Sequence, residues 1–205
     1  MDKLLKTDVQ ELEKKLDLSY YKGNDKYSEG YIEDIMLRAC LEDNEEQLLR
    51  NERVFPVLYH LSDMRRNLLE WYPFNGNEEV LEVGSGCGAL TGLLSEKCKK
   101  VTCVELSKKR SLINAKRNKE KNNVDIRVGN FQDCEKDLGY YNIIFLIGVL
   151  EYSSSFILNE KNPYLWVLNT LKNHLRTKGR IIIAIENKMG LKYWNGAWED
   201  HTDKQ

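Results

Sequence analysis

The 205-residue sequence predicts an α/β protein with a doubly wound, mostly parallel sheet and an N-terminal helical extension. Two observations predict this class. After the turn signal Asn75–Gly76, short apolar runs alternate with stretches of helical periodicity, the pattern of repeated strand–helix units. The run at 142–147 is apolar almost throughout, as expected for a strand buried on both faces of a parallel sheet.

Residues 1–75 are expected to form the helical extension or a lid. Apolar residues recur there at helical spacing, at Val9, Leu12 and Leu16 and again at Ile32, Ile35, Met36 and Ala39. The link at 19–30 carries turn formers and predicts a loop. A further helix is expected from an N-cap at Ser62 to the residue before Pro73. Its apolar face would hold Met64, Leu68 and Trp71.

Residues 76–205 are expected to form one ligand-binding domain. Its strands are predicted at 79–83, 100–105, 124–128, 142–147 and 179–185, and its helices at 89–96, 108–121 and 163–175. Right-handed crossovers place the carboxyl ends of such strands along one edge of the sheet, where ligands bind.

The composition and charge exclude several classes of protein. No run of roughly 18 apolar residues occurs, so no membrane span is expected, and the absence of an apolar signal core predicts a cytoplasmic protein. The five scattered cysteines form no C-x-x-C pair, which predicts reduced thiols and no metal site. A formal net charge of -1 argues against a nucleic-acid partner. The one basic stretch, 97–121, is expected to be a solvated helix face.

A loop at 81–91 holds three alternate glycines, Gly84, Gly86 and Gly88, between a predicted strand and a predicted helix. Such a loop brings backbone amides close to a ligand. Gly84, Gly86 and Ala89 also match the dinucleotide fingerprint G-x-G-x-x-G/A, so an NAD-linked oxidoreductase stays an alternative.

Three features favour S-adenosylmethionine over a dinucleotide as the cofactor. The dinucleotide pattern does not require Gly88, and Glu82 places an acid before the glycines, where it can orient the ammonium of a methionine moiety. S-adenosylmethionine also has no pyrophosphate for the helix N-terminus to neutralise. Glu105 ends the second predicted strand and is expected to accept hydrogen bonds from two ribose hydroxyls, a feature that both cofactors share.

The pattern of Glu82, the three glycines and Glu105 resembles the class I S-adenosylmethionine-dependent methyltransferases, which have a Rossmann-like fold. The resemblance extends over residues 78–186. It implies that Asn130 and Phe131 hold the adenine, although the family usually has an acid where Asn130 stands.

The same resemblance implies that Gly148 lets the chain pass close to the sulfonium. The family sheet has two more strands, and no second apolar run follows Ile185, so we expect the terminal strands to be missing and the chain to be a piece of a longer protein. A narrower resemblance, at 59–62, 67–74 and 184–202, is to a bacterial subset associated with glycosyltransferases and surface polysaccharide synthesis. It implies O-methylation of a saccharide or another small polar acceptor.

The tail after the fifth strand mixes aromatic and polar side chains, and Glu186, Asn187, Trp194 and Trp198 are candidates for binding the acceptor. Rings can stack on the C–H faces of a sugar while carboxylates and amides bind its hydroxyls. Ordinary packing of the two tryptophans is the alternative. His201 is a candidate base, although methyl transfer often needs positioning more than a base.

Three other functions stay open. An NAD-linked oxidoreductase lacks a recognisable hydride-transfer constellation, whereas missing strands keep open a non-catalytic methyltransferase-like binding domain. Nucleic-acid methylation lacks the Asn/Asp-Pro-Pro-aromatic motif, because Gly148-Val-Leu-Glu follows the fourth strand. An open apolar edge at 179–185 predicts a homodimer through that strand. His60 and His174 are expected to be structural.

Overall fold

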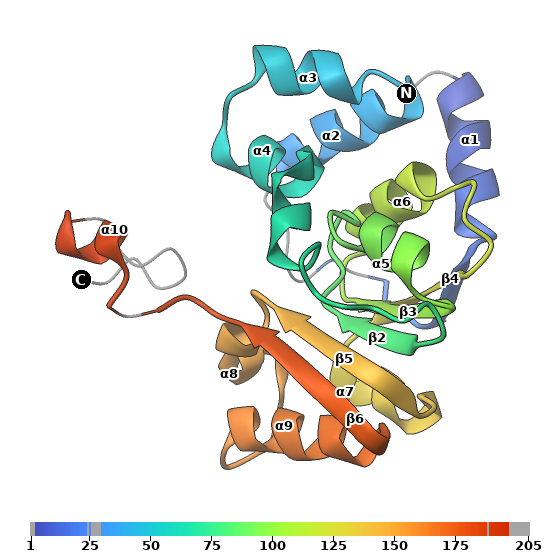
Figure 1. The fold of residues 1–205 in the computed structure, drawn as a ribbon. Helices are drawn as coiled ribbons and strands as arrows, with labels where there is room; N and C mark the ends of the chain where they lie inside the picture. Colours follow the sequence, from blue (N-terminus) through green and yellow to red (C-terminus); the bar gives the residue numbers. More distant parts are fainter. Residues whose placement is uncertain (1–2, 24, 26–29, 188, 197–205) are drawn as a thin grey trace.

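The computed structural model describes residues 3–23, 25, 30–187 and 189–196 (Figure 1). Within these residues, six parallel strands form one sheet in the order β1-β4-β3-β2-β5-β6. The strands are β1 (Leu16–Tyr20), β2 (Glu79–Val83), β3 (Lys100–Glu105), β4 (Val124–Gly129), β5 (Tyr141–Ile147) and β6 (Leu175–Ala184). From β2 the chain winds outward to β3 and β4, and then on the other side of β2 to β5 and β6. This confirms the predicted doubly wound, parallel sheet and places the reversal of strand order at β2 and β5, where ligands bind.

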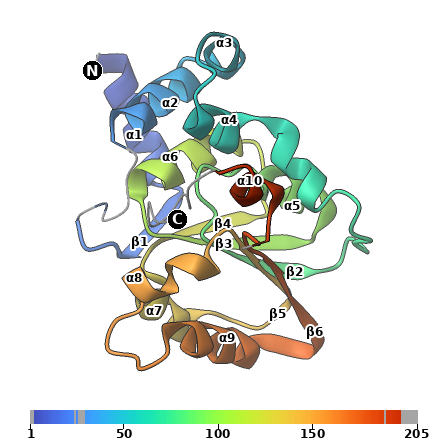
Figure 2. The ribbon, with the colours of Figure 1, turned by 90° about the vertical axis from the view of Figure 1, so that its left-hand side faces the viewer.

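Helices cover both faces of the sheet. They are α1 (Lys3–Glu13), α2 (Tyr31–Leu41), α3 (Glu45–Asn51), α4 (Phe55–Leu61), η1 (Asp63–Leu68), α5 (Thr91–Lys97), α6 (Lys108–Arg117), α7 (Phe131–Cys134), η2 (Glu135–Asp137), η3 (Leu150–Tyr152), α8 (Ser153–Phe156), α9 (Pro163–Asn173) and α10 (Leu191–Trp194). The N-terminal helices lie with α5 and α6 on one face, and α7, α8 and α9 lie on the other (Figures 1 and 2).

Each face of the sheet has its own apolar core, because successive side chains of a strand point to opposite faces. Val80 and Phe145 pack on the side of α5 and α6, whereas Leu81 and Ile144 pack on the side of α7 and α9. Ile144 and Phe145 are both fully buried, which confirms that β5 is covered on both faces.

The structure at Leu16 differs from the predicted helix. The spacing of Val9, Leu12 and Leu16 predicts one helix, but α1 ends at Glu13 and Leu16 begins β1, which pairs with β4. From Leu16 onward the burial alternates with period two, the pattern of a strand. The N-terminal extension therefore also contributes an edge strand to the sheet.

The basic stretch on α6 is not the solvated face that the sequence predicts. Its cations form ion pairs with acids of the N-terminal segment: Lys108–Glu13, Lys109–Asp34, Arg110–Glu33, Lys116–Asp43 and Arg117–Glu45, at 2.6–3.2 Å. The basic residues thus hold the N-terminal helices on the sheet domain. Sequence reasoning missed this because the paired acids lie more than 70 positions away along the chain.

The prediction of a helix from the N-cap Ser62 to the residue before Pro73 is also wrong. Only the 3₁₀ turn η1 forms, it ends at Leu68, and the side chain of Ser62 makes no capping hydrogen bond. Met64 and Trp71 are 74% and 73% exposed, so the expected apolar face does not pack into the core. Met64 and Leu68 instead line a cavity.

Further features of the described part of the chain concern its helices, its metal-ligating side chains, its cysteines and one histidine. No helix there is long and apolar enough to cross a bilayer. No group of metal-ligating side chains occurs among the same residues. All five cysteines are described, and they are buried free thiols as predicted. His174 is structural, because its ring Nδ1 lies 2.9 Å from the carbonyl oxygen of Gly139.

Candidate functional site

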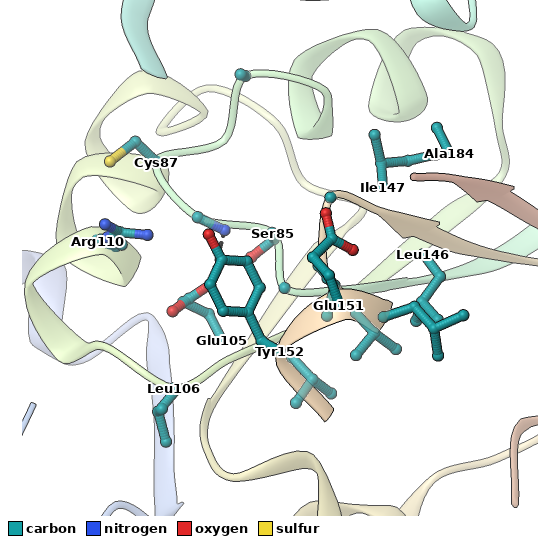
Figure 3. A pocket seen from close by; sticks show the side chains of 18 of the residues that line it. Ser85, Cys87, Glu105, Leu106, Arg110, Leu146, Ile147, Glu151, Tyr152 and Ala184 are labelled. Carbon is teal, nitrogen blue, oxygen red and sulfur yellow. Dashed lines mark hydrogen bonds between the residues drawn. The ribbon is translucent and has the colours of Figure 1, made fainter. Parts of the chain in front are cut away.

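A cavity of 1170 Å³ lies at the carboxyl ends of the central strands (Figure 3). Residues that directly follow β2, β3, β5 and β6 line it, among them Gly84, Leu106, Gly148 and Ile185. Its opposite wall comes from α4 and η1, residues 55–68, which we call the roof. The cavity therefore lies where the strand order reverses, as expected for the ligand site of such a sheet.

The three glycines of the loop after β2 have different roles. All three have positive φ, at 70°, 54° and 78° for Gly84, Gly86 and Gly88. A Cβ on Gly84 would lie 2.4 Å from Val149, and one on Gly88 would lie 2.4 Å from the Asn114 amide oxygen. A Cβ on Gly86 would meet only the His60 ring, at 3.8 Å. Gly86 is therefore open to the cavity, whereas Gly88 is required for packing and does not line it.

Glu105 has the geometry of a ligand-binding carboxylate at the end of β3. The backbone amide of Gly86 donates to Oε2 at 2.8 Å, and the amide of Ser107 donates to Oε1 at 2.9 Å. Each carboxylate oxygen can accept a second hydrogen bond. Glu105 is buried and lines the cavity, so it is preorganised to bind neighbouring hydroxyls (Figure 3).

Arg110 is a cavity residue that sequence reasoning missed (Figure 3). It lies on α6, and its Nε donates to the buried carboxylate of Glu33 at 2.7 Å. Burial works to lower the pKa of Arg110, but the carboxylates of Glu105 and Glu33 outweigh it and hold the pKa above its ordinary value. The charge of Arg110 thus stabilises two buried acids, one of them beside the cavity.

Glu82 lies outside the cavity lining, and its predicted role in orienting a methionine ammonium, directly or through water, stays a prediction. Its side chain points to the α5 face of β2, where Thr91 Oγ1 donates to it at 2.6 Å and Cys103 Sγ lies at 3.6 Å. Burial raises the pKa of Glu82 to about 7. The Glu82 side chain therefore links the end of β2, just before the glycine loop, to the first turn of α5.

Asn130 and Phe131 follow β4 and both line the cavity. The side-chain amide of Asn130 makes its hydrogen bonds within the protein. Its Oδ1 caps α7 by accepting from the Gln132 amide at 3.1 Å, and its Nδ2 donates to the Phe156 carbonyl at 2.7 Å. The pairing of this amide with an adenine edge stays a prediction. Phe131 is buried, with its ring centroid 6.1 Å from that of Trp166.

A comparison with protein families identifies the part of the chain around this cavity. Residues 80–179 match the family model described as a methyltransferase domain. The chain contains a class I methyltransferase domain. This match supports the predicted methyltransferase class, and the strand order gives the domain the predicted Rossmann-like fold.

Two curated proteins share part of the methyltransferase domain, and both are named "Ribosomal RNA small subunit methyltransferase A". The one from Fusobacterium nucleatum subsp. nucleatum is 43% identical over 51 residues, which is 25% of this chain and 19% of that protein. The one from Mesomycoplasma hyopneumoniae is 39% identical over 75 residues, 35% of this chain and 29% of that protein. The chain thus spans less than a third of either relative.

Two solved structures show the same fold. A phosphoethanolamine N-methyltransferase 1 from Haemonchus contortus, bound to phosphoethanolamine and S-adenosylhomocysteine, superposes with a TM-score of 0.55 at 16% identity. The match covers 79% of this chain and 35% of that one. A DhpI–SAM–HEP complex superposes with a TM-score of 0.50 at 18% identity, covering 85% and 75% of the two chains. At these identities the likeness concerns the fold of the methyltransferase domain.

The roof, which belongs to the predicted N-terminal extension or lid, borders the cavity opposite the sheet, but the sequence did not indicate which of its side chains reach the cavity. A Cβ on Gly148, where φ is 66°, would lie 3.0 Å from the Tyr59 hydroxyl. His60, expected to be structural, is buried and lines the cavity opposite Gly86. The available signal was the motif at 59–62, which the sequence analysis used only for a family resemblance.

The tail residues that the structure describes differ in their relation to the cavity. Glu186 lines it and accepts a hydrogen bond from the Tyr193 hydroxyl. Asn187 does not line it, and its Oδ1 instead accepts from the Met189 amide at 2.9 Å. Trp194 also lies outside the lining, with 73% of its surface exposed. The remaining candidates, Trp198 and His201, lie outside the described residues.

Proposed function

We propose that the protein is an S-adenosylmethionine-dependent methyltransferase that methylates a hydroxyl oxygen of a saccharide or another small polar molecule. The observation that carries this proposal is the size and continuity of the cavity. At 1170 Å³ it exceeds the roughly 300–1,000 Å³ of a pocket for one drug-sized molecule, so it has room for a cofactor and an acceptor together.

The residues at one end of the cavity fit S-adenosylmethionine. Glu105 offers two oxygens to the ribose hydroxyls, and Gly86 leaves its face of the loop open. Phe131 and the backbone after β4 form the wall for the adenine, and Gly148 borders the reacting sulfur. When bound there, S-adenosylmethionine supplies a methyl group on a positively charged sulfur.

The other end of the cavity offers aromatic rings and carboxylates to an acceptor. Tyr59 and Tyr152 supply rings, and Glu151 and Glu186 supply carboxylates. Rings can stack on the C–H faces of a sugar while carboxylates accept hydrogen bonds from its hydroxyls. This composition supports a saccharide acceptor.

Glu151 is the carboxylate best placed to orient the reacting hydroxyl. A Cβ on Gly148 would lie 3.8 Å from Glu151 Oε1, so this oxygen lies beside the end of β5 where the sulfur is expected (Figure 3). A hydroxyl that donates to this carboxylate would be held for in-line attack on the methyl carbon. His201 as a base stays a prediction.

Nucleic-acid methylation is the second candidate, because the two partial relatives carry ribosomal RNA in their names. The main basic stretch of the chain argues against it, since the cations of α6 are neutralised by acids of the N-terminal helices. A strong RNA-binding site needs cations that can contact phosphates. An NAD-linked oxidoreductase and a non-catalytic binding domain are the remaining alternatives.

Further parts of the proposal concern organisation. We propose that residues 1–75 act as a lid over residues 76–205, and that the protein is cytoplasmic and belongs to the subset associated with polysaccharide synthesis. A homodimer through β6 is supported by that strand's outer edge, which pairs with no other described strand. Ile183 and Ile185 at this edge are 41% and 52% exposed.

A transfer assay with S-adenosylmethionine labelled in its methyl group tests the acceptor class. The protein is incubated in parallel with neutral and acidic oligosaccharides and with ribosomal RNA, and products are identified by mass spectrometry. We expect label in a saccharide methyl ether, and Glu151→Gln should slow its formation without weakening S-adenosylhomocysteine binding. Label in RNA alone would overturn the acceptor proposal, and cofactor binding without transfer to any acceptor would favour a non-catalytic domain.

A further inference from the structure

A cation on the roof has no role in the site described so far. Arg65 lies in η1, is half-buried and lines the cavity. Its guanidinium carbon lies 4.1 Å from the centroid of the Tyr59 ring. No carboxylate among the described residues forms an ion pair with Arg65, whereas the adjacent Arg66 pairs with Glu96 at 2.7 Å. An unpaired, partly desolvated guanidinium facing a cavity indicates an anionic ligand group.

The neighbours of Arg65 place it at one end of the cofactor site. The guanidinium of Arg65 stacks on the ring of Tyr59. The Tyr59 hydroxyl lies 3.0 Å from the position that a Cβ on Gly148 would take. Burial raises the pKa of Glu82, and the positive charge of Arg65 is close enough to oppose part of this rise. Arg65 therefore lies on the side of the cavity where Tyr59 approaches Gly148, at the end of β5. A ligand whose ribose is held at Glu105 would extend its 5′ substituent toward this side of the cavity.

The charges of the cofactor limit what Arg65 can contact there. The 5′ substituent of S-adenosylmethionine carries two cations, the sulfonium and the α-ammonium, and one anion, the α-carboxylate. A guanidinium next to either cation is repelled, whereas a carboxylate can accept two parallel N–H bonds from it. The stacked Tyr59 ring limits the positions of the guanidinium, so less entropy is lost when the bonds form.

We propose that Arg65 binds the α-carboxylate of the cofactor's methionine moiety and that Tyr59 holds the guanidinium in position. This rests on the proposed use of S-adenosylmethionine. The roof then takes part in cofactor binding. Although it lies outside the sheet, it supplies a positive charge to the α-carboxylate, which the uncharged backbone of the glycine loop cannot do.

The test compares two ligands that differ only in the carboxylate: S-adenosylhomocysteine and its decarboxylated analogue, in which a 3-aminopropyl group replaces the amino-acid chain. Calorimetric titrations measure both against the wild type, Arg65→Met and Arg65→Lys. We expect Arg65→Met to weaken S-adenosylhomocysteine binding about ten- to a hundredfold and leave the analogue within about twofold. Arg65→Lys should restore part of the loss, since it keeps the charge but not the bidentate geometry.

Arg66→Met is the matched control, because it removes a neighbouring arginine whose partner is Glu96 rather than a ligand. It should change neither affinity. Equal loss of both ligands in Arg65→Met would overturn the proposal by showing a structural role. Unchanged binding of both, with a raised KM for the acceptor, would overturn it by assigning Arg65 to the acceptor. Failure of the wild type to bind either ligand would instead refute the methyltransferase function itself.

Discussion

The two walls of the cavity are built in different ways. The sheet wall consists of the loops after β2, β3 and β5, where Gly86, Glu105 and Gly148 are fixed by positive φ angles and backbone hydrogen bonds. The roof consists of short helical turns, from which Tyr59 and Arg65 extend long side chains into the cavity. The sheet wall therefore has a fixed shape set by the backbone, whereas the roof has a shape set by side chains.

This difference suggests that the two walls bind different parts of the ligands. In the proposed binding mode, the adenine and ribose, which all S-adenosyl ligands share, face the wall whose backbone is fixed. The methionine end of the proposed cofactor and part of the proposed acceptor would face the wall whose side chains can change without altering the sheet. Substitutions in the sheet wall should therefore affect folding and cofactor binding together, whereas substitutions in the roof should affect ligand binding with little effect on folding.

The largest effects are expected within the glycine loop. Gly88→Ala should lower the free energy of unfolding by about 3 kcal/mol, because a left-handed φ costs about 1–2 kcal/mol and the new methyl group collides with Asn114. Gly86→Val should cost only about 1–2 kcal/mol through its φ but abolish S-adenosylhomocysteine binding, because its side chain enters the cavity. Urea unfolding and calorimetry measure the two quantities. Equal destabilisation, or normal ligand binding by folded Gly86→Val, would contradict the roles assigned to these glycines.

Glu105→Gln should weaken S-adenosylhomocysteine binding about ten- to a hundredfold, since charge-assisted bonds to the ribose hydroxyls are lost. Stability should also fall, by about 1–3 kcal/mol, because a Gln amide group must face one of the two backbone amides that now donate to the carboxylate. A 2′-deoxy analogue should lose less affinity on mutation than the parent ligand does. Equal losses for both ligands would show that Glu105 does not hold the ribose.

The sheet wall was largely predictable from the sequence, and the roof was not. Glu105 and Gly86 belong to a local pattern of strand, loop and helix, and their positions follow from that pattern alone. Arg65 and His60 reach the cavity because the N-terminal helices pack on α6, through an apolar cluster and through ion pairs between residues far apart in the chain. Such long-range pairing leaves no periodic signal.

The two acids of the sheet wall show the limit of local prediction as well. Glu82 and Glu105 both end or flank strands near the glycine loop, but alternation along β2 turns Glu82 away from the cavity. The strand β1 was missed for a similar reason. Leu12 and Leu16 fit a helical period, and only the pairing of Leu16 with Ile126 of β4 decides the structure.

Glu82→Gln should change the pH dependence of stability. The pKa of Glu82 in the folded protein is about 7, above its ordinary value of 4.5, so the folded protein binds more protons than the unfolded chain between these values. Wild-type stability should therefore fall as pH rises from about 5 to 8, by up to about 3 kcal/mol from this group. The variant should lack this part of the slope in urea unfolding. Parallel pH profiles for the two proteins would contradict a protonated Glu82.

The smallest effect on folding is expected in the roof. Met64 is 74% exposed at the cavity rim, so Met64→Ala should change the free energy of unfolding by less than about 0.5 kcal/mol and leave S-adenosylhomocysteine affinity unchanged. It should alter the KM for the acceptor, measured in the methyl-transfer assay. A loss of stability comparable to that of Gly88→Ala would show that the roof is as fixed as the sheet wall.

Separate calorimetric titrations of the purified protein with S-adenosylhomocysteine and with NAD test the central claim most directly. The glycine loop alone would admit either ligand, whereas the match of residues 80–179 to a methyltransferase domain favours the first. S-adenosylhomocysteine should bind with micromolar affinity, and NAD should give no heat of binding. Tight binding of NAD with no response to S-adenosylhomocysteine would contradict the assignment of this site to a methyltransferase.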